Sequence, residues 1–507
     1  MLRVSTVLLL AAGALAGADT WFTSGDRPQF TPAHRLVGVG ASHRELTDEQ
    51  ISERTEMMIE AQTFGIVRDA RCLPGAQKIL SPQMLKLFQD AERQSGLRWS
   101  LIAAIAYLES FGDSNAQSPA GPKGIMQVSS GTAKSMGLRM IYATRYRNVT
   151  GKQTVKGRRG KLVTKQVRRK VPYSVLMTDE RLVPQRAIPA AANYLARLEK
   201  RYEGLDWAIF AYHCGEGCVA SMRALTENAR GIKAPYTVPK MFFANDPSFN
   251  REIYQAIQRE MERDWSPTYY FRVLCAERML GLYKKDPAEL KRLVEEHRWE
   301  PDPRVRAPHR LSVWLKTSDL EYHSSDDIRR DEGTRLVHAF ENEELFGFRL
   351  RKDLLAAGES AEGDRFAQAS PPTIGTLAYI AFETRRLHAL MKPRGEKFVP
   401  LEVTALVHPA DFQRRSPRGR DESVWHSTGQ VFDIDIRNLP VGEREALDFV
   451  LDDIGNMGYL GFIEESRGEG VMHIGCSPSS RDFFNEVFAD AQKAASKHAV
   501  TAEGTRR

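Results

Sequence analysis

Residues 99–127, WSLIAAIAYLESFGDSNAQSPAGPKGIMQ, decide the fold of the first half of this chain. An apolar run from Leu101 to Leu108 predicts a helix that ends in one carboxylate, Glu109. Apolar side chains surround this helix on every side, so we expect it to be buried, with Ser100 as its N-cap. Burial disfavours the charged form of a carboxylate and keeps a Glu able to act as a general acid near neutral pH. The alternative is a Glu near a helix end that reaches solvent.

The composition indicates a globular protein that acts on an anionic partner. Of the 507 residues, 42% are hydrophobic and 27% are charged, which is typical of a globular protein. A chain of this length is expected to form two or three domains. The formal net charge of +7 favours a cell-wall polymer, an anionic lipid or nucleic acid as partner. Residues 1–18 have the pattern of a secretory signal, and an uncleaved membrane anchor is the alternative. No later run approaches the roughly 18 apolar residues that cross a bilayer, so membrane contact is expected only there. Export makes nucleic acid a poor partner.

Cysteine usage fits an oxidising compartment without defining a disulfide pattern. The five cysteines are Cys72, Cys214, Cys218, Cys275 and Cys476. Their odd number leaves at least one thiol unpaired or intermolecular. The sequence His213-Cys214 followed by Cys218 lacks an evident fourth zinc ligand, so disulfides or buried thiols are expected.

Helices are predicted on both sides of a basic segment. Residues 19–84 are expected to form a helical extension that packs ahead of the central helix, and Thr47 with Gln50 has the pattern of a capping box. An amphipathic pattern at 188–203 and an apolar one at 205–212 predict two further helices.

The basic segment itself covers residues 139–178. Eleven Lys or Arg residues lie within 145–170, and no Asp or Glu occurs within 114–178. Alternation within 161–171 predicts a β-hairpin arm. Two interpretations stay open: an electrostatic contact with an anionic polymer, or a mobile, solvated loop.

An ordered set of short motifs extends over residues 85–231. The motifs are Glu109-Ser110, Ser118-Pro-Ala-Gly121, Gly124-Ile-Met-Gln127, Thr132-Ala133, Tyr194-Leu195 and Ala211-Tyr212-x-x-Gly215. Together they resemble the soluble lytic transglycosylase (SLT) family, which is also similar to goose-type lysozymes. The resemblance implies a mainly α, lysozyme-like domain with the basic segment as an insertion.

The resemblance also implies a mechanism with Glu109 as the only catalytic carboxylate. Glu109 would protonate the glycosidic oxygen between MurNAc and GlcNAc. It would then accept the proton of the MurNAc C6 hydroxyl, which attacks C1 to give a 1,6-anhydro product. Most glycosidases use two carboxylates, so a hydrolase that activates water with Asp113 or Asp179 is the alternative. No cofactor is expected for this domain. Ser110 would orient Glu109, and the implied substrate-binding residues are Ser110, Gly124, Met126, Gln127 and Tyr212.

Two features depart from the family pattern. The family usually has Asn after Ala-Tyr, whereas this chain has His213, and Cys214 follows it. The basic segment is an insertion before the later helices. Neither departure removes Glu109, although both bear on the fit of the substrate.

Residues 232–372 are expected to form a helical spacer and linker. A strongly apolar helix is predicted at 265–283, and the polar, small-residue stretch 356–372 is typical of a linker. No catalytic group is evident here, so a packing or spacer role is expected.

Residues 373–507 have the pattern of a small α+β domain. The predicted elements are strands at 401–407 and 431–436, a helix at 441–457, and a hairpin of 459–465 with 471–475. His426, Asp433 and His473 lie on or beside these strands. Two imidazoles and a carboxylate can supply three metal ligands and leave a position open for water, as catalytic zinc requires.

The spacing of these residues resembles the zinc D-alanyl-D-alanine carboxypeptidases and related murein endopeptidases. The pattern is His426-x-x-Gly429-x-x-x-Asp433, followed by a strand-borne His473. The resemblance implies that His426, Asp433 and His473 hold zinc. Asp435, on the same strand face as Asp433, could replace it as ligand. A metal-free domain that only binds stem peptides is the alternative.

The base of such a peptidase is less defined. The family often has Glu three residues before the last His, but this chain has Gly470 there. Glu465, taken as the catalytic base, and Glu469 are both candidates. His408 stands where relatives usually have Arg, which bears on recognition of the peptide carboxylate.

The sequence therefore predicts an exported, multidomain, murein-processing protein. A mainly α transglycosylase domain would cut glycan, and a zinc-peptidase-like domain after the spacer would trim or bind the crosslinking peptide. The expected partner is peptidoglycan, both glycan strand and stem peptide, in the periplasm or cell envelope. The alternative from another class is a catalytically silent glycan-binding scaffold.

Overall fold

The computed structural model describes residues 46–156, 162–264, 266–298, 310–315, 321–340, 346–351, 366–415, 424–464 and 470–505. The expected signal at residues 1–18 and the candidate base Glu465 lie outside these ranges. Within them, no helix combines the length and apolar character needed to cross a membrane. The described chain divides into two compact units. The helical unit comprises residues 46–315 and 452–459, and the mixed unit comprises residues 321–451 and 460–505.

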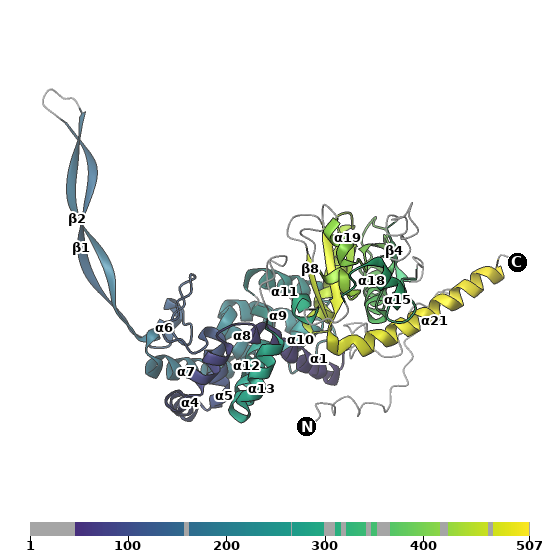
Figure 1. The fold of residues 1–507 in the computed structure, drawn as a ribbon. Helices are drawn as coiled ribbons and strands as arrows, with labels where there is room; N and C mark the ends of the chain where they lie inside the picture. The colour runs from purple at the N-terminus through teal and green to yellow at the C-terminus, as the bar shows by residue number, and fades with distance from the viewer. Residues whose placement is uncertain are drawn as a thin grey trace. The chain divides into compact units, whose positions relative to one another are not determined.

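The helical unit consists of helices interrupted by one long pair of strands (Figure 1). Its elements are α1 (Asp48–Ala61), α2 (Thr63–Val67), α3 (Cys72–Ile79), α4 (Pro82–Ser95), α5 (Trp99–Ser110), α6 (Ser130–Ser135), β1 (Met140–Lys156), β2 (Leu162–Asp179), η1 (Glu180–Leu182), α7 (Pro184–Tyr202), α8 (Leu205–Cys214), α9 (Glu216–Glu227), α10 (Val238–Phe243), α11 (Arg251–Asp264), η2 (Ser266–Thr268), α12 (Tyr269–Lys285), α13 (Pro287–Glu296) and α14 (Arg310–Leu315). The predicted capping box of α1 is confirmed: the Gln50 N–H donates to Thr47 Oγ1, and the Thr47 N–H donates to Gln50 Oε1.

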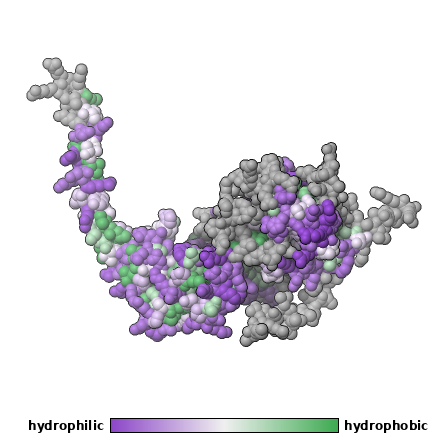
Figure 2. All heavy atoms as spheres, in the orientation of Figure 1, coloured by the Kyte–Doolittle hydropathy of each residue, from purple (hydrophilic) through white to green (hydrophobic). Residues whose placement is uncertain are grey.

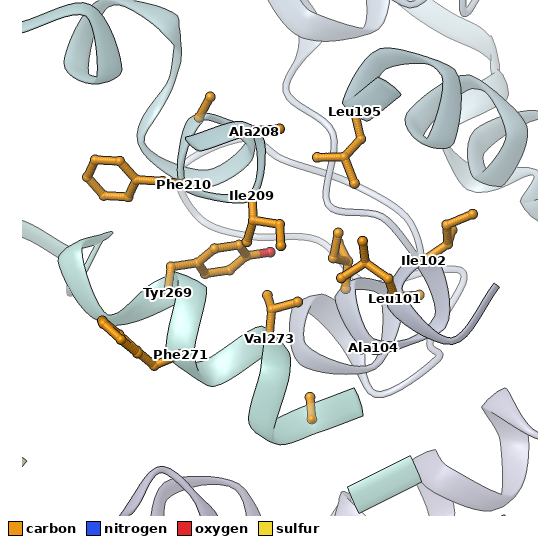
Figure 3. Packing of buried hydrophobic residues seen from close by; sticks show 14 of the residues in the cluster. Leu101, Ile102, Ala104, Leu195, Ala208, Ile209, Phe210, Tyr269, Phe271 and Val273 are labelled. Atoms are coloured by element: carbon orange, nitrogen blue, oxygen red, sulfur yellow. The ribbon is translucent and has the colours of Figure 1, made fainter. Parts of the chain in front are cut away.

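Helix α5 lies in the core of the helical unit, as its apolar run predicts. Every residue from Leu101 to Tyr107 is buried. Helices α3, α4 and α12 pack against α5, and Figure 3 shows side chains of α5, α8 and α12 meeting in this core. The prediction of Ser100 as N-cap is wrong, because the N-cap is Arg98 and the Ser100 hydroxyl instead donates to Glu277 of α12 at 2.5 Å.

Residues 232–298 do not form a separate spacer. Phe243 of α10, Tyr269 and Phe271 of α12 and Leu290 of α13 are buried in the same hydrophobic cluster as α5. The physical reason is that α5 is apolar all round, so a further helix has to cover the face that the preceding helices leave open. The structure therefore does not divide the chain at residue 231, where the sequence placed a boundary.

The basic segment forms the β-hairpin that its alternating pattern predicts. Strands β1 and β2 pair antiparallel from Met140 opposite Asp179 to Lys156 opposite Leu162, with an irregularity at Ile141 and Tyr142. Figure 2 shows mainly hydrophilic side chains along this ribbon, with some hydrophobic ones between them.

The mixed unit has the predicted α+β pattern. Its elements are α15 (Ser325–Asp331), β3 (Val337–His338), β4 (Phe348–Leu350), β5 (Gln368–Ala369), α18 (Pro371–Met391), β6 (Leu401–Ala405), α19 (Ala410–Arg415), η4 (Val424–Thr428), β7 (Phe432–Asp435), α20 (Val441–Asn456), β8 (Leu460–Glu464), β9 (Val471–Cys476), η5 (Pro478–Ser480) and α21 (Arg481–Thr505). One sheet has the order β4-β6-β7-β9-β8, with β4 and β6 parallel and the other neighbours antiparallel.

This unit begins before the predicted boundary at residue 373. Strand β4 pairs with β6, so residues 348–350 belong to the sheet. Strand β5, at residues 368–369, pairs with β3. Part of the stretch 356–372, which the sequence assigned to a linker, is therefore paired strand. A strand as short as β4 carries too little pattern for its pairing to be predicted.

Candidate active site and candidate metal centre

Three helices place side chains around Glu109. Glu109 lies in the last turn of α5, and its side chain is 15% exposed. Tyr269, the first residue of α12, donates its hydroxyl to Glu109 Oε1 at 2.6 Å. His213, near the end of α8, has Nδ1 4.0 Å from the same oxygen. The Glu109 carboxyl is thus largely withdrawn from solvent and accepts one strong hydrogen bond.

The surroundings of Glu109 give its carboxyl an unusual pKa. Burial raises the pKa of Glu109 to about 7, and the hydrogen bond from Tyr269 and the positive charge of Arg272 limit that rise. Among the described residues, no second carboxylate contributes to this shift. Burial and the charge of Glu109 raise the pKa of Tyr269 well above its ordinary value, so Tyr269 stays a neutral donor. A carboxyl with a pKa near 7 can give and take a proton at neutral pH.

The sequence patterns do not predict Tyr269 as a site residue, because it lies in the stretch assigned to a spacer. One signal was available: a Tyr hydroxyl within an apolar helix needs a hydrogen-bond partner when it is buried. The ring of Tyr269 also stacks on the ring of His213, with centroids 4.4 Å apart and planes inclined by 8°. Figure 3 shows Tyr269 reaching from α12 into the shared core.

His213 therefore belongs to this site rather than to a cysteine zinc cluster. Its ring stacks on the Tyr269 ring, and its Nδ1 lies 4.0 Å from Glu109 Oε1. All five cysteines are described, and Cys72, Cys275 and Cys476 are buried thiols. The expectation of buried thiols therefore holds for Cys72, Cys275 and Cys476, while Cys214 and Cys218 are half-buried.

Ser110 does not orient Glu109 by a direct bond, contrary to the expectation. Its side chain is buried, and its hydroxyl lies 2.9 Å from the carbonyl oxygen of Ile125 and 3.1 Å from that of Ala106. The hydroxyl therefore points toward the preceding turn of α5 and toward the next loop, and not toward Glu109. Ser110 thus ties the loop at residues 124–127 to α5.

The loop requires a glycine at its start. Gly124 has φ +80°, and a Cβ at this position would lie 1.9 Å from the carbonyl oxygen of Arg181. Only glycine combines this backbone conformation with this close approach. Gln127, at φ +43°, closes the turn because its Nε2 donates to the carbonyl oxygens of Gly124 at 2.8 Å and Ala116 at 3.2 Å.

Tyr212 ties the same loop to α8. Its hydroxyl donates to the carbonyl oxygen of Met126 at 2.8 Å, and Met126 itself is buried. Burial raises the pKa of Tyr212 well above its ordinary value, and the nearby charge of Glu109 adds to this rise. The structure thus brings together all the site residues predicted for the first domain, but Ser110, Gly124 and Met126 shape the loop from its interior.

The two candidate second acids are engaged elsewhere. Asp113 is exposed, and its Oδ1 accepts the backbone N–H of Asn115 at 2.9 Å. Asp179 forms a buried ion pair with Arg181, at 2.7 Å and 2.9 Å, which holds the pKa of Asp179 below its ordinary value. Neither carboxylate contributes to the pKa of Glu109.

Comparison with known proteins assigns this region. Residues 86–152 and 161–234 match the family model of the transglycosylase SLT domain. This part of the chain is similar to the transglycosylase SLT domain. Over 152 residues the chain is 30% identical to the membrane-bound lytic murein transglycosylase F of Alcanivorax borkumensis. That segment covers 29% of this chain and 24% of the relative, so the chain matches about a quarter of the relative's length. The SLT match includes Glu109 and ends before Tyr269.

The mixed unit brings together the three predicted metal ligands. Strand pairing sets Asp433 of β7 directly opposite His473 of β9, and η4 carries His426 just before β7. Asp433 Oδ1 lies 2.6 Å from His473 Nδ1, and Asp433 Oδ2 lies 3.0 Å from His426 Nε2. All three residues are buried, and one possible ligand atom from each lies within 4.8 Å of the others.

The hydrogen bonds of this cluster suit a bound zinc ion. His426 Nδ1 lies 2.9 Å from the carbonyl oxygen of Leu406, which can only accept, so Nδ1 carries the proton and Nε2 faces the cluster. Burial alone would raise the pKa of Asp433, but the imidazoles of His426 and His473 hold it well below its ordinary value. His408, whose ring centroid lies 5.6 Å from that of His426, borders the cluster.

Residue 470, where the resemblance would place a catalytic Glu, has little room for a side chain. Gly470 has φ +65°, and a Cβ there would lie 2.0 Å from Cγ of Arg437. Arg437 also holds Asp435, whose Oδ1 accepts the Arg437 backbone N–H at 2.9 Å, so Asp435 is engaged outside the cluster. The candidate bases Glu465 and Glu469 lie outside the described residues.

Proposed function

We propose that this protein is a peptidoglycan lytic transglycosylase that cleaves the β-1,4 bond between MurNAc and GlcNAc. The observation that carries the proposal is the state of Glu109. It is a nearly buried carboxyl with a pKa of about 7, at the end of the central helix of an SLT domain, with Tyr269 bonded to one oxygen.

The two proton transfers follow from this geometry. Tyr269 occupies Oε1 of Glu109, so Oε2 is the oxygen left to carry the transferred proton. Protonation of the glycosidic oxygen leaves Glu109 as a carboxylate, which the Tyr269 hydroxyl and the charge of Arg272 stabilise. The carboxylate then accepts the proton of the MurNAc C6 hydroxyl as that oxygen attacks C1. The products are a 1,6-anhydroMurNAc end and a free GlcNAc end, and Glu109 is protonated again.

The positions of the other acids favour this route over hydrolysis. A hydrolase of the two-carboxylate type needs a second carboxylate beside the bond that it cuts. Asp113 faces solvent and caps Asn115, while Asp179 is neutralised by Arg181. The substrate's own hydroxyl can serve as nucleophile without either group.

Digestion of purified murein sacculi tests this proposal. Wild-type protein should release muropeptides that end in 1,6-anhydroMurNAc, as measured by mass spectrometry. Glu109→Gln should release none, and Asp113→Asn is the matched control that should cleave normally. Reducing MurNAc ends, together with inactivity of the Asp113 variant, would instead identify a lysozyme-type hydrolase. Turnover by the Glu109 variant equal to wild type would refute the assigned role.

We place this activity in the cell envelope, because murein is found there. The matched relative is named a membrane-bound murein enzyme, which supports the same location. Fractionation of cells that express the full chain provides the test, and recovery only in the cytoplasm would contradict export.

For the mixed unit, we propose a zinc site formed by His426, Asp433 and His473. The buried cluster of two imidazoles and a carboxylate supports this proposal. A zinc ion there would supply Lewis acidity toward a stem-peptide amide. The site would bind or trim the stem peptide, and trimming would need a base such as Glu465. Metal analysis of the full chain, purified without chelators, should find about one zinc per chain in wild type and none in Asp433→Ala. Stem-peptide cleavage that disappears in Glu465→Gln would assign the base, and a wild type without zinc would leave a peptide-binding module.

A further inference from the structure

The ribbon formed by β1 and β2 carries a positive charge that the described acidic side chains do not neutralise beyond its base. Within its described residues, ion pairs occur only at its base, where Arg139 binds Glu180 and Arg181 binds Asp179. The remaining described cations form no ion pair and are exposed: Arg145, Arg147, Lys152, Arg168, Arg169 and Lys170. Such a surface has to meet its counter-charges outside the chain.

The strand register places these cations on two faces of different character. Directly opposite residues of an antiparallel pair share a face. Tyr146 opposite Pro172, Asn148 opposite Lys170, Thr150 opposite Arg168 and Lys152 opposite Gln166 make one face, which we name the tyrosine face. Tyr142, paired with Leu176, begins the same face nearer the base. The tyrosines are 55% and 66% exposed, at Tyr142 and Tyr146 respectively. The other face carries Arg145 opposite Tyr173, Arg147 opposite Val171 and Val149 opposite Arg169. There the guanidinium of Arg147 lies over the ring of Tyr173, so this ring is partly covered.

The chemistry of the tyrosine face fits an anionic glycan. Flat, exposed tyrosine rings offer apolar surfaces to the faces of sugar rings, and their hydroxyls stay in water. Asn148 and Thr150 offer hydrogen bonds, while Lys170 and Arg168 offer cations to carboxylates. Murein combines these features, because its glycan strand bears stem peptides with free carboxylates.

The base of the ribbon is fixed to the loop beside Glu109. The guanidinium of Arg181 donates to the carbonyl oxygens of Val128 at 3.2 Å and Gly121 at 3.4 Å, and its own carbonyl packs on Gly124. Arg139 and Glu180 close the two strands at the same end. A polymer held on the ribbon is therefore tethered to the loop of the active site, which raises its effective concentration there.

We propose that the tyrosine face of the β1–β2 ribbon is a second binding surface for murein, separate from the cleavage site, that retains the glycan strand through its carboxylates. The proposal rests on the proposed function only for the identity of the polymer. Its main consequence concerns affinity for large, charged murein and not the rate constant of bond cleavage.

The test is binding without cleavage. Full-length protein carrying Glu109→Gln is mixed with purified sacculi, and the bound fraction is measured by pelleting at several salt concentrations. The test variant adds Lys152→Gln, Arg168→Gln and Lys170→Gln, the three described cations of the tyrosine face. The matched control instead adds the substitutions Lys78→Gln, Lys86→Gln and Lys291→Gln, exposed cations of α3, α4 and α13 without an ion pair. Both triples remove the same charge.

The ribbon triple should weaken binding to sacculi by about tenfold at low salt. Each exposed ion pair changes the binding constant by roughly twofold, and three such factors multiply. This loss should fade as salt rises, because salt screens exposed charges. The control triple should bind like the parent. Sacculi whose stem carboxylates have been amidated should bind the parent and the ribbon triple equally. Tyr146→Ser, which removes no charge, should weaken binding at all salt concentrations.

Equal binding of the two triples would overturn the proposal. So would a ribbon triple that binds sacculi normally but loses binding to vesicles containing anionic phospholipid, because the occupant would then be a membrane surface. These outcomes are independent of the proposed function, since every protein in the assay lacks Glu109. Failure of wild type to cleave sacculi would refute the enzyme while leaving the binding result valid.

Discussion

Replacement of Tyr269 by Phe tests how the protein sets the pKa of Glu109. The hydroxyl donates to Glu109 Oε1 at 2.6 Å and stabilises the carboxylate form. A hydrogen bond to a charged group contributes about 1.5–3 kcal/mol, which corresponds to about one to two pKa units. The pKa of Glu109, about 7 in wild type, should therefore rise in the variant. The same loss acts on the carboxylate that forms during cleavage, so kcat/KM should fall about ten- to hundredfold below pH 6.

The measurement is the pH dependence of kcat/KM, which reports the pKa of groups in the free enzyme. Glu109 acts first as an acid, so activity declines as pH rises through its pKa. In Tyr269→Phe that decline should move to higher pH. Tyr270→Phe is the matched control, because the charges that act on the Tyr270 hydroxyl include those of Asp206 and Arg98 and not that of Glu109. An alkaline limb that stays in place, or that moves to lower pH, would refute the assigned role of Tyr269.

Three further outcomes are expected. Gly124→Ala should lower the free energy of unfolding by about 2 kcal/mol or more, measured by thermal unfolding, because its Cβ would meet backbone at 1.9 Å with φ +80°. Gly131→Ala on α6 should cost little, because its Cβ would meet only Ser129 Oγ, at 3.9 Å. Glu109→Gln should be more stable than wild type at pH 8 by about 3 kcal/mol, and this difference should disappear by pH 4.5. The sign follows because the folded pKa of about 7 exceeds the ordinary 4.5, so the wild type loses stability as pH rises between these values; a constant difference would contradict it. Chelation of metal, or Asp433→Ala, should lower the unfolding temperature of the mixed unit without changing glycan cleavage, and an equal loss of cleavage would contradict the independence of the two sites.

Local patterns were sufficient where neighbours in the chain decide the outcome. The apolar run before Glu109 predicts both a helix and its burial, since no face of that helix is polar. The alternation within the basic segment likewise predicts the β1–β2 hairpin, because that pattern is local to the two strands. His426 and Asp433 are close in sequence, and a correct prediction of the strands also brings in His473.

Other features depend on contacts between distant segments, which no local pattern contains. Tyr269 lies 160 residues from Glu109, and only the packing of α12 on α5 brings them together. The Ser110 hydroxyl could bond to Glu109 or to a carbonyl group, and the choice depends on where the loop at Ile125 comes to lie. Strand β4 joins the sheet through β6, so the start of the mixed unit could not be located from its own three residues.

The role of α12 connects the fold of the helical unit to its chemistry. By covering α5, this helix contributes to the burial that raises the pKa of Glu109, and through Tyr269 it donates the bond that limits the rise. Burial alone would favour an acid that holds its proton too firmly to release it. A strong donor alone would favour a carboxylate that is too weak a base for the second step. One helix supplies both effects, so a single carboxyl can serve as acid and then as base, and the residues beyond the SLT match are part of the proposed active site.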